Sequence, residues 1–374
     1  LSTLVLMAQK DFKMEYRLVG ETGLKVSVLG MGAMTYDTVD KTLELLRCVR
    51  KYGVNFFDNA EAYGNPIRGI AEINFGKALK ILQKEDPKLW RRSDLVLTTK
   101  IFWGPQAGDV KLGPDRRSVG VNEIGLTRKH LFEGIRDALK RQQVEYVDIV
   151  YAHRPDPLTS IENIVRSFND ILKAGYAFEW GTSMWKPTQI VEAYFIAKSL
   201  NLRPPVIEQP IYSMLDRSVM EKSYLDLFKQ PYNLATTIWN VLDRGILSGK
   251  YNKMIPKDAR LSGNNRLGAF VGHSKHVTKE KIDKVEKLMA IANELNISVA
   301  ELAIGWAIKN RNVTVCILGG TKTYQLEQSM GAIAAANKLN SYYLQRIEKI
   351  LNNKPAPDAF DIVWRSNPQI ISKL

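Results

Sequence analysis

Eight short apolar runs, rich in β-branched residues, recur along this chain and constrain its fold more than any other feature. Segments with the period of an amphipathic helix separate them, and this alternation is typical of parallel βαβ units. Eight such repeats close naturally into a barrel, whereas a doubly wound sheet usually has about five or six strands. We therefore expect an α/β protein with a (β/α)8 TIM barrel. The runs are 26–32, 54–58, 95–100, 147–153, 177–183, 205–211, 234–241 and 313–320.

The segments between the runs carry recognisable helix boundaries. In residues 160–175, apolar side chains recur at helical spacing. Ser160 precedes the first of them and is a good N-cap, and Gly175 follows the last and is a good stop. This segment therefore predicts a complete amphipathic helix between the fourth and fifth strands.

Two further segments are expected to cover the two ends of the barrel. Residues 16–30 read as two short strands around the turn "GETG", a hairpin that would plug the bottom of the barrel. Residues 243–278 contain five glycines and little helical period. A loop of this length is usually functional, and because it leaves the seventh strand it would lie over the top face.

Size and composition favour one soluble domain. The chain has 374 residues, 45% of them hydrophobic, and we predict a single domain over 14–354, a disordered or non-native tail over 1–13 and a C-terminal extension over 355–374. No apolar run is long enough to insert into a membrane. The net charge is +14, but the basic residues are scattered along the chain and aromatic residues do not alternate with them as in nucleic-acid binding sites. We therefore expect no nucleic-acid partner. Two cysteines within regular elements suit a reducing compartment, so the cytoplasm is expected.

Four chemically distinct side chains stand at or just after the ends of successive predicted strands. Asp58 ends the second strand and Tyr63 follows it, Lys100 ends the third, and His153 ends the fourth. In a barrel of this kind, reacting groups lie where strands end and βα loops begin. Each residue alone is weak evidence, but together they predict a catalytic site at one mouth.

This set of side chains suits the reduction of a small carbonyl substrate. A tyrosine has an ordinary pKa of about 10, and we expect the Lys100 ammonium to lower the pKa of Tyr63 so that it donates a proton more readily. Asp58 would pair with Lys100 and offset the cost of burying its charge. His153 would orient the substrate carbonyl oxygen toward the phenol.

Reduction also needs a cofactor that supplies hydride, because no side chain does so. The chain has no glycine-rich Rossmann fingerprint, so other polar residues must hold it. Ser183 and Gln209, at the ends of the fifth and sixth strands, would hydrogen-bond the carboxamide of a nicotinamide. A phosphate cradle is predicted from Lys250, Arg260, Gly319, Thr321 and Gln325. No metal site is expected, since His273 and His276 have no cysteine or acidic ligand beside them.

These residues lie within motifs that resemble the aldo-keto reductases, most closely the branch that contains the beta subunits of voltage-gated potassium channels. The resemblance spans about residues 14–354 and includes "FFDNAEAYG", "VEYVDIVYAHRPDP", "WGTSMW", "GILSGKY" and "ILGGTKTYQLEQSMGAI". It implies that Tyr63 is the proton donor, with Asp58 and Lys100 as its partners. It further implies NADPH bound in an extended pose, with Trp239 and Leu242 among its contacts and Arg260 at the 2′-phosphate.

The same resemblance leaves a second function open. His153 stands where channel beta subunits usually have asparagine, which favours an active enzyme. Ala33 and Met34, however, replace a Thr-Trp pair near the nicotinamide, and the loop after the third strand is longer than in the relatives. The alternative is therefore a non-catalytic or redox-sensing subunit that binds NADPH within a homo-oligomer or a larger protein assembly.

Overall fold

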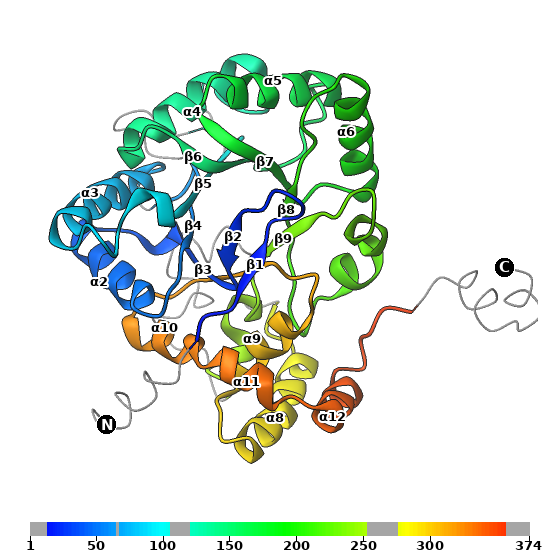
Figure 1. The fold of residues 1–374 in the computed structure, drawn as a ribbon. Helices are drawn as coiled ribbons and strands as arrows, with labels where there is room; N and C mark the ends of the chain where they lie inside the picture. Colours follow the sequence, from blue (N-terminus) through cyan, green and yellow to red (C-terminus); the bar gives the residue numbers. More distant parts are fainter. Residues whose placement is uncertain (1–12, 65–66, 105–119, 253–275, 357–374) are drawn as a thin grey trace, which may run out of the picture.

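Eight parallel strands close into a barrel in the computed structural model of the protein, in the order β10-β3-β4-β5-β6-β7-β8-β9. The structure describes residues 13–64, 67–104, 120–252 and 276–356. Figure 1 shows the helices arranged around these strands. The predicted (β/α)8 TIM barrel is confirmed. Its strands are β3 (Leu29–Gly32), β4 (Phe56–Asp58), β5 (Val96–Ile101), β6 (Val147–Ala152), β7 (Ala177–Ser183), β8 (Ile207–Gln209), β9 (Ala235–Ile238) and β10 (Val315–Leu318).

Helices form the outer layer (Figure 1). The helix predicted after the fourth strand is present, with Ser160 accepting a hydrogen bond from Asn163 N and Gly175 in a left-handed conformation at its end. The helices are α2 (Val39–Arg50), α3 (Ile70–Glu85), α4 (Arg128–Gln142), α5 (Ile161–Lys173), α6 (Pro187–Ser199), α8 (Lys279–Glu294), α9 (Val299–Lys309), α10 (Thr323–Met330), α11 (Ala332–Lys338) and α12 (Ser341–Leu351). Of these, α4, α5 and α9 pack on strands, whereas α11 packs on α9 and α12 on α8.

One of the eight expected strand-helix repeats is irregular. Between β8 and β9 the described chain forms a π-helical turn, η3 (Val219–Ser223), and a 3-10 turn, η4 (Leu225–Phe228), in place of an α-helix. Met220, Tyr224 and Leu227 are buried at helical spacing. The apolar pattern is therefore kept while the backbone bonding is not regular. Three more short turns are η1 (Ala33–Thr35), η2 (Arg92–Asp94) and η5 (Asp243–Ser248).

The predicted N-terminal hairpin closes one end of the barrel. Its strands, β1 (Tyr16–Leu18) and β2 (Lys25–Ser27), are antiparallel and cross the middle of the barrel in Figure 1. Val19 and Val26 are fully buried and pack with inward-facing residues near the starts of the barrel strands, including Phe56 and Val96. The prediction of a single strand over 26–32 is wrong, because these residues belong to two strands, the hairpin strand β2 and the barrel strand β3.

Several predicted segments extend beyond the part of the chain that the structure describes. They include most of the 1–13 tail, most of the 243–278 loop with Arg260 and His273, and most of the 355–374 extension. Within the described ranges, no single helix is long and apolar enough to cross a membrane. One pair, α8 with α9, meets the length and composition of a span only together, and it is bent by 89°.

Candidate active site

The inward-facing side chains of the barrel form two layers. Apolar residues such as Phe56, Val96 and Ile207 fill the layer beside the hairpin. Because successive side chains on a strand point to opposite faces, residues two or four positions further on also point into the barrel, nearer its other end. Buried polar residues occupy this second layer: Asp58, Thr98, Lys100, His153, Ser183, Gln209 and Thr237.

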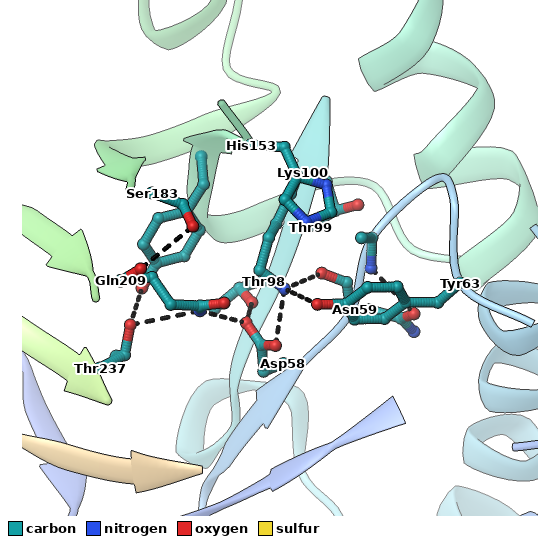
Figure 2. A network of polar contacts seen from close by, with 12 residues as sticks. Asp58, Asn59, Tyr63, Thr98, Thr99, Lys100, His153, Ser183, Gln209 and Thr237 are labelled. Carbon is teal, nitrogen blue, oxygen red and sulfur yellow. Dashed lines mark hydrogen bonds and ion pairs between the residues drawn. The ribbon is translucent and has the colours of Figure 1, made fainter. Parts of the chain in front are cut away.

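Lys100 stands at the centre of this polar layer and is fully buried. Its Nζ lies 2.6 Å from Asp58 Oδ2, 2.8 Å from the backbone oxygen of Asn59 and 3.0 Å from the hydroxyl oxygen of Tyr63. Figure 2 shows these three contacts converging on the ammonium group. Burial lowers the pKa of Lys100, but Asp58 and Tyr63 together outweigh burial and leave this pKa raised. The group is therefore a cation at neutral pH.

Asp58 is held by neutral donors as well as by Lys100. Its Oδ1 accepts hydrogen bonds from Thr98 Oγ1 at 3.1 Å and from Gln209 Nε2 at 3.0 Å. The Gln209 amide nitrogen also lies 3.3 Å from Thr237 Oγ1 (Figure 2). These bonds join the ends of β4, β5, β8 and β9, so the carboxylate is fixed from several sides.

The pKa of Tyr63 corrects one expectation from the sequence. Burial raises the pKa of Tyr63, Lys100 lowers it, and the net result is a raised pKa rather than the lowered one that we expected. Burial wins because a phenolate in a dry site loses its hydration. The hydroxyl group therefore holds its proton at neutral pH while remaining hydrogen-bonded to a cation.

His153 packs edge-on against Tyr63. The centroids of the two rings are 5.7 Å apart and their planes meet at 78°. Burial, together with the charges of Lys100, Arg154 and Arg68, holds the pKa of His153 well below its usual range. The imidazole is therefore neutral. Its Nδ1 is buried and has no hydrogen-bond partner among the described residues, so a polar atom is left for a ligand to satisfy.

The two residues predicted to hold a nicotinamide carboxamide lie beside this cluster. Ser183 is buried and donates a hydrogen bond to the backbone oxygen of Gln209 at 3.1 Å. Gln209 binds Asp58 through its amide nitrogen. The structure therefore brings both residues to the predicted mouth, already hydrogen-bonded to their neighbours.

The other predicted cofactor residues follow β9 and β10. Trp239 and Leu242 are half-buried just after β9, and Lys250 is exposed after η5, with its Nζ 5.0 Å from the centroid of the Tyr251 ring. Thr321 is exposed and donates through its backbone N to Gln325 Oε1 at 3.0 Å. Gly319 is exposed, and apart from its own atoms and its two chain neighbours no heavy atom of the described residues lies within 4 Å of the place where a Cβ would stand. Arg260 is outside the described residues.

Sequence reasoning missed four polar residues of this mouth. Asn59, Thr98 and Thr237 bind Lys100, Asp58 and Gln209, and Arg154 donates to Ser183 Oγ at 3.3 Å. Strand alternation would have found Thr98, because it stands two positions before Lys100 on β5. Asn59 binds through its backbone oxygen, so its side chain carried no signal.

Comparisons with known proteins agree with this architecture. The profile of the Aldo/keto reductase family matches residues 28–352. A probable voltage-gated potassium channel subunit beta from Arabidopsis thaliana is 40% identical, over 91% of this chain and 98% of its own length. A protein of the same description from Oryza sativa subsp. japonica has the same identity and coverage. A putative voltage-gated potassium channel subunit beta from Schizosaccharomyces pombe is 38% identical over 91% of this chain and 94% of its own length.

The family match covers most of the barrel, including every strand from β3 to β10. The relatives are similar over nearly their whole length, so the likeness is not confined to one motif. Fold, site geometry and comparisons therefore agree that the chain belongs to the aldo/keto reductase family of oxidoreductases.

Proposed function

We propose that this protein reduces the carbonyl group of a small aldehyde or ketone with NADPH as the cofactor, and that Tyr63 donates the proton. The contact that carries the proposal is the hydrogen bond between Lys100 Nζ and the Tyr63 hydroxyl oxygen, 3.0 Å long, with Asp58 behind the ammonium group. A buried phenol beside a buried cation suits proton donation to an oxygen that gains negative charge.

The residues after β7 to β10 fit a nicotinamide dinucleotide. Ser183 and Gln209 offer hydroxyl and amide groups for the carboxamide, and the open space beside the backbone of Gly319 lets a phosphate approach closely. Lys250, Thr321 and Gln325 add polar groups, and Trp239, Leu242 and Arg260 complete the proposed set. When bound, the nicotinamide supplies hydride to the carbonyl carbon.

The chain's own groups then have complementary roles. The neutral imidazole of His153 orients the carbonyl oxygen, and Tyr63 delivers its proton to that oxygen. The phenolate that remains is stabilised by Lys100, and Asp58 keeps the ammonium charged in a buried site. The raised pKa of Tyr63 keeps the donor protonated until the oxygen becomes basic.

Steady-state kinetics test this proposal. Oxidation of NADPH is followed by absorbance with a simple aldehyde such as 4-nitrobenzaldehyde, in the wild-type protein and in Tyr63→Phe. We expect turnover in the first and a large loss in the second. Titration of intrinsic tryptophan fluorescence with NADPH and NADH measures cofactor choice, and tighter binding of NADPH is expected. Equal turnover by the two proteins contradicts the role of Tyr63.

A second function is favoured by the names of the relatives, which are described as channel beta subunits. In this proposal the protein is a cytoplasmic, NADPH-binding subunit of a homo-oligomer or a larger assembly, with a voltage-gated potassium channel as the partner to test. Ala33 and Met34 near the site motivate it, and Met34 is 38% exposed. A stable complex with the channel's cytoplasmic domain, together with no turnover of any aldehyde, would favour this function over the enzyme.

A further inference from the structure

Arg154 is a cation at the candidate site that the proposed chemistry does not use. It follows His153 directly after β6 and is half-buried. Its Nη1 donates to Ser183 Oγ at 3.3 Å and to the backbone oxygen of His153. The guanidinium group therefore lies at the ends of two neighbouring strands, β6 and β7, on the side of the mouth that carries the His153 imidazole.

Within the described ranges, Arg154 forms no ion pair with a carboxylate. The Asp58 carboxylate of the same mouth is already paired with Lys100. Glu208 lies on β8 next to Gln209, but it points to the opposite face of the strand and accepts hydrogen bonds from Thr182, Trp185 and Tyr224. Among the described residues, Arg154 therefore has no carboxylate within ion-pair distance, and Glu208 acts on its charge only at longer range. A partly buried guanidinium group is thus left with N–H donors that a ligand carboxylate could satisfy.

The position of Arg154 separates its ligand from the cofactor phosphates. The residues proposed for the phosphates, Lys250 and Thr321, follow β9 and β10. In the barrel order, β6 is three strands from β9 and four from β10, so Arg154 stands across the mouth from them. An anionic group that reaches Arg154 while a carbonyl lies at Tyr63 and His153 therefore belongs to the substrate.

We infer that Arg154 binds a carboxylate of the substrate, so that the preferred substrates are aldehydes or ketones that carry a carboxylate group. This inference rests on the proposed function and specifies its substrate class. A guanidinium group presents parallel N–H donors that match the two oxygens of a carboxylate. Hydrogen bonds of this charged kind discriminate by about 10- to 100-fold against an uncharged analogue.

The test compares two aldehydes of similar shape, 4-carboxybenzaldehyde and its methyl ester, methyl 4-formylbenzoate. The readout is the ratio of their kcat/KM values. In the wild-type protein we expect the carboxylate to be preferred by about tenfold or more. Arg154→Gln should abolish this preference and Arg154→Lys should restore part of it. The matched control is Arg128→Gln on α4, whose side chain is 59% exposed and paired with Asp170, and it should keep the wild-type ratio.

A second measurement separates this inference from the proposed reduction. Binding of 4-(hydroxymethyl)benzoate, followed by tryptophan fluorescence, needs no turnover and should weaken about tenfold or more in Arg154→Gln. If neither aldehyde is reduced but the benzoate still binds through Arg154, the anion site stands and the reductase proposal is wrong. If both aldehydes are reduced with equal efficiency, or the ratio is the same in Arg154→Gln, the inference about Arg154 is overturned.

Discussion

The Nζ atom of Lys100 lies 3.0 Å from the hydroxyl oxygen of Tyr63 and 2.6 Å from Asp58 Oδ2. One buried ammonium thus contacts a neutral phenol on one side and a carboxylate on the other. The carboxylate keeps the lysine charged, and the lysine stabilises whatever negative charge forms on the phenol oxygen.

Removing the Tyr63 hydroxyl should abolish reduction without removing the cofactor. Tyr63→Phe keeps the ring that packs on His153 but has no proton to donate. Because a positioned general acid contributes about 10²- to 10⁴-fold, we expect kcat to fall by at least about 100-fold. NADPH affinity, measured by fluorescence titration, should remain close to that of the wild type. A variant that keeps full activity would exclude Tyr63 as the donor.

Removing the Lys100 charge should destabilise the fold as well as the chemistry. Lys100→Met leaves Asp58 as a buried charge without its partner, and such a loss costs about 3–5 kcal/mol. The double variant Lys100→Met with Asp58→Asn removes both charges, so it should regain much of the stability but none of the activity. Denaturant unfolding monitored by fluorescence measures the free energies, and the double-mutant cycle gives the coupling. Additive effects of the two changes would contradict the pairing.

The pH dependence of reduction should be level over a broad range. His153 is neutral because its pKa lies well below the usual range, and Tyr63 stays protonated because its pKa is raised. Activity needs protonated Tyr63, so it is lost only as the pH rises through that raised value. We therefore expect kcat/KM to be level from about pH 6 to about pH 9. A steep loss of kcat/KM as the pH rises from 6 to 7 would show that a protonated histidine is required.

Glu208 should make stability depend on pH. Burial raises the pKa of this carboxyl group to about 7, from an ordinary value of 4.5. The folded protein holds the proton more tightly than the unfolded chain, so the stabilisation is fully present below pH 4.5 and is lost as the pH rises to about 7. The loss amounts to about 3 kcal/mol.

The isosteric change Glu208→Gln has no proton to lose and tests this dependence. The difference in unfolding free energy between the variant and the wild type should shift in favour of the variant as the pH rises from about 4.5 to about 8. Glu192→Gln, an exposed change on α6, serves as the control and should show no such shift. A difference that is constant across this range would mean that folding does not raise the pKa of Glu208.

The sequence alone determined the barrel and the strand ends that meet at its mouth. Alternation of apolar runs with helical segments is a local pattern, and strand ends at one edge of a parallel barrel must face the same side. Asp58, Tyr63, Lys100 and His153 were therefore predictable as neighbours. The irregular connection between β8 and β9 was not, because its apolar spacing is the same as that of a helix.

Only the tertiary structure decided the ionisation of these groups and their exact partners. The pKa of Tyr63 is raised because the burial supplied by distant segments outweighs the charge of its neighbour Lys100. Gln209 contacts Asp58 across 151 positions of the chain. Desolvation and hydrogen bonds between remote residues arise when the barrel closes, and a linear pattern of residue types carries no information about either.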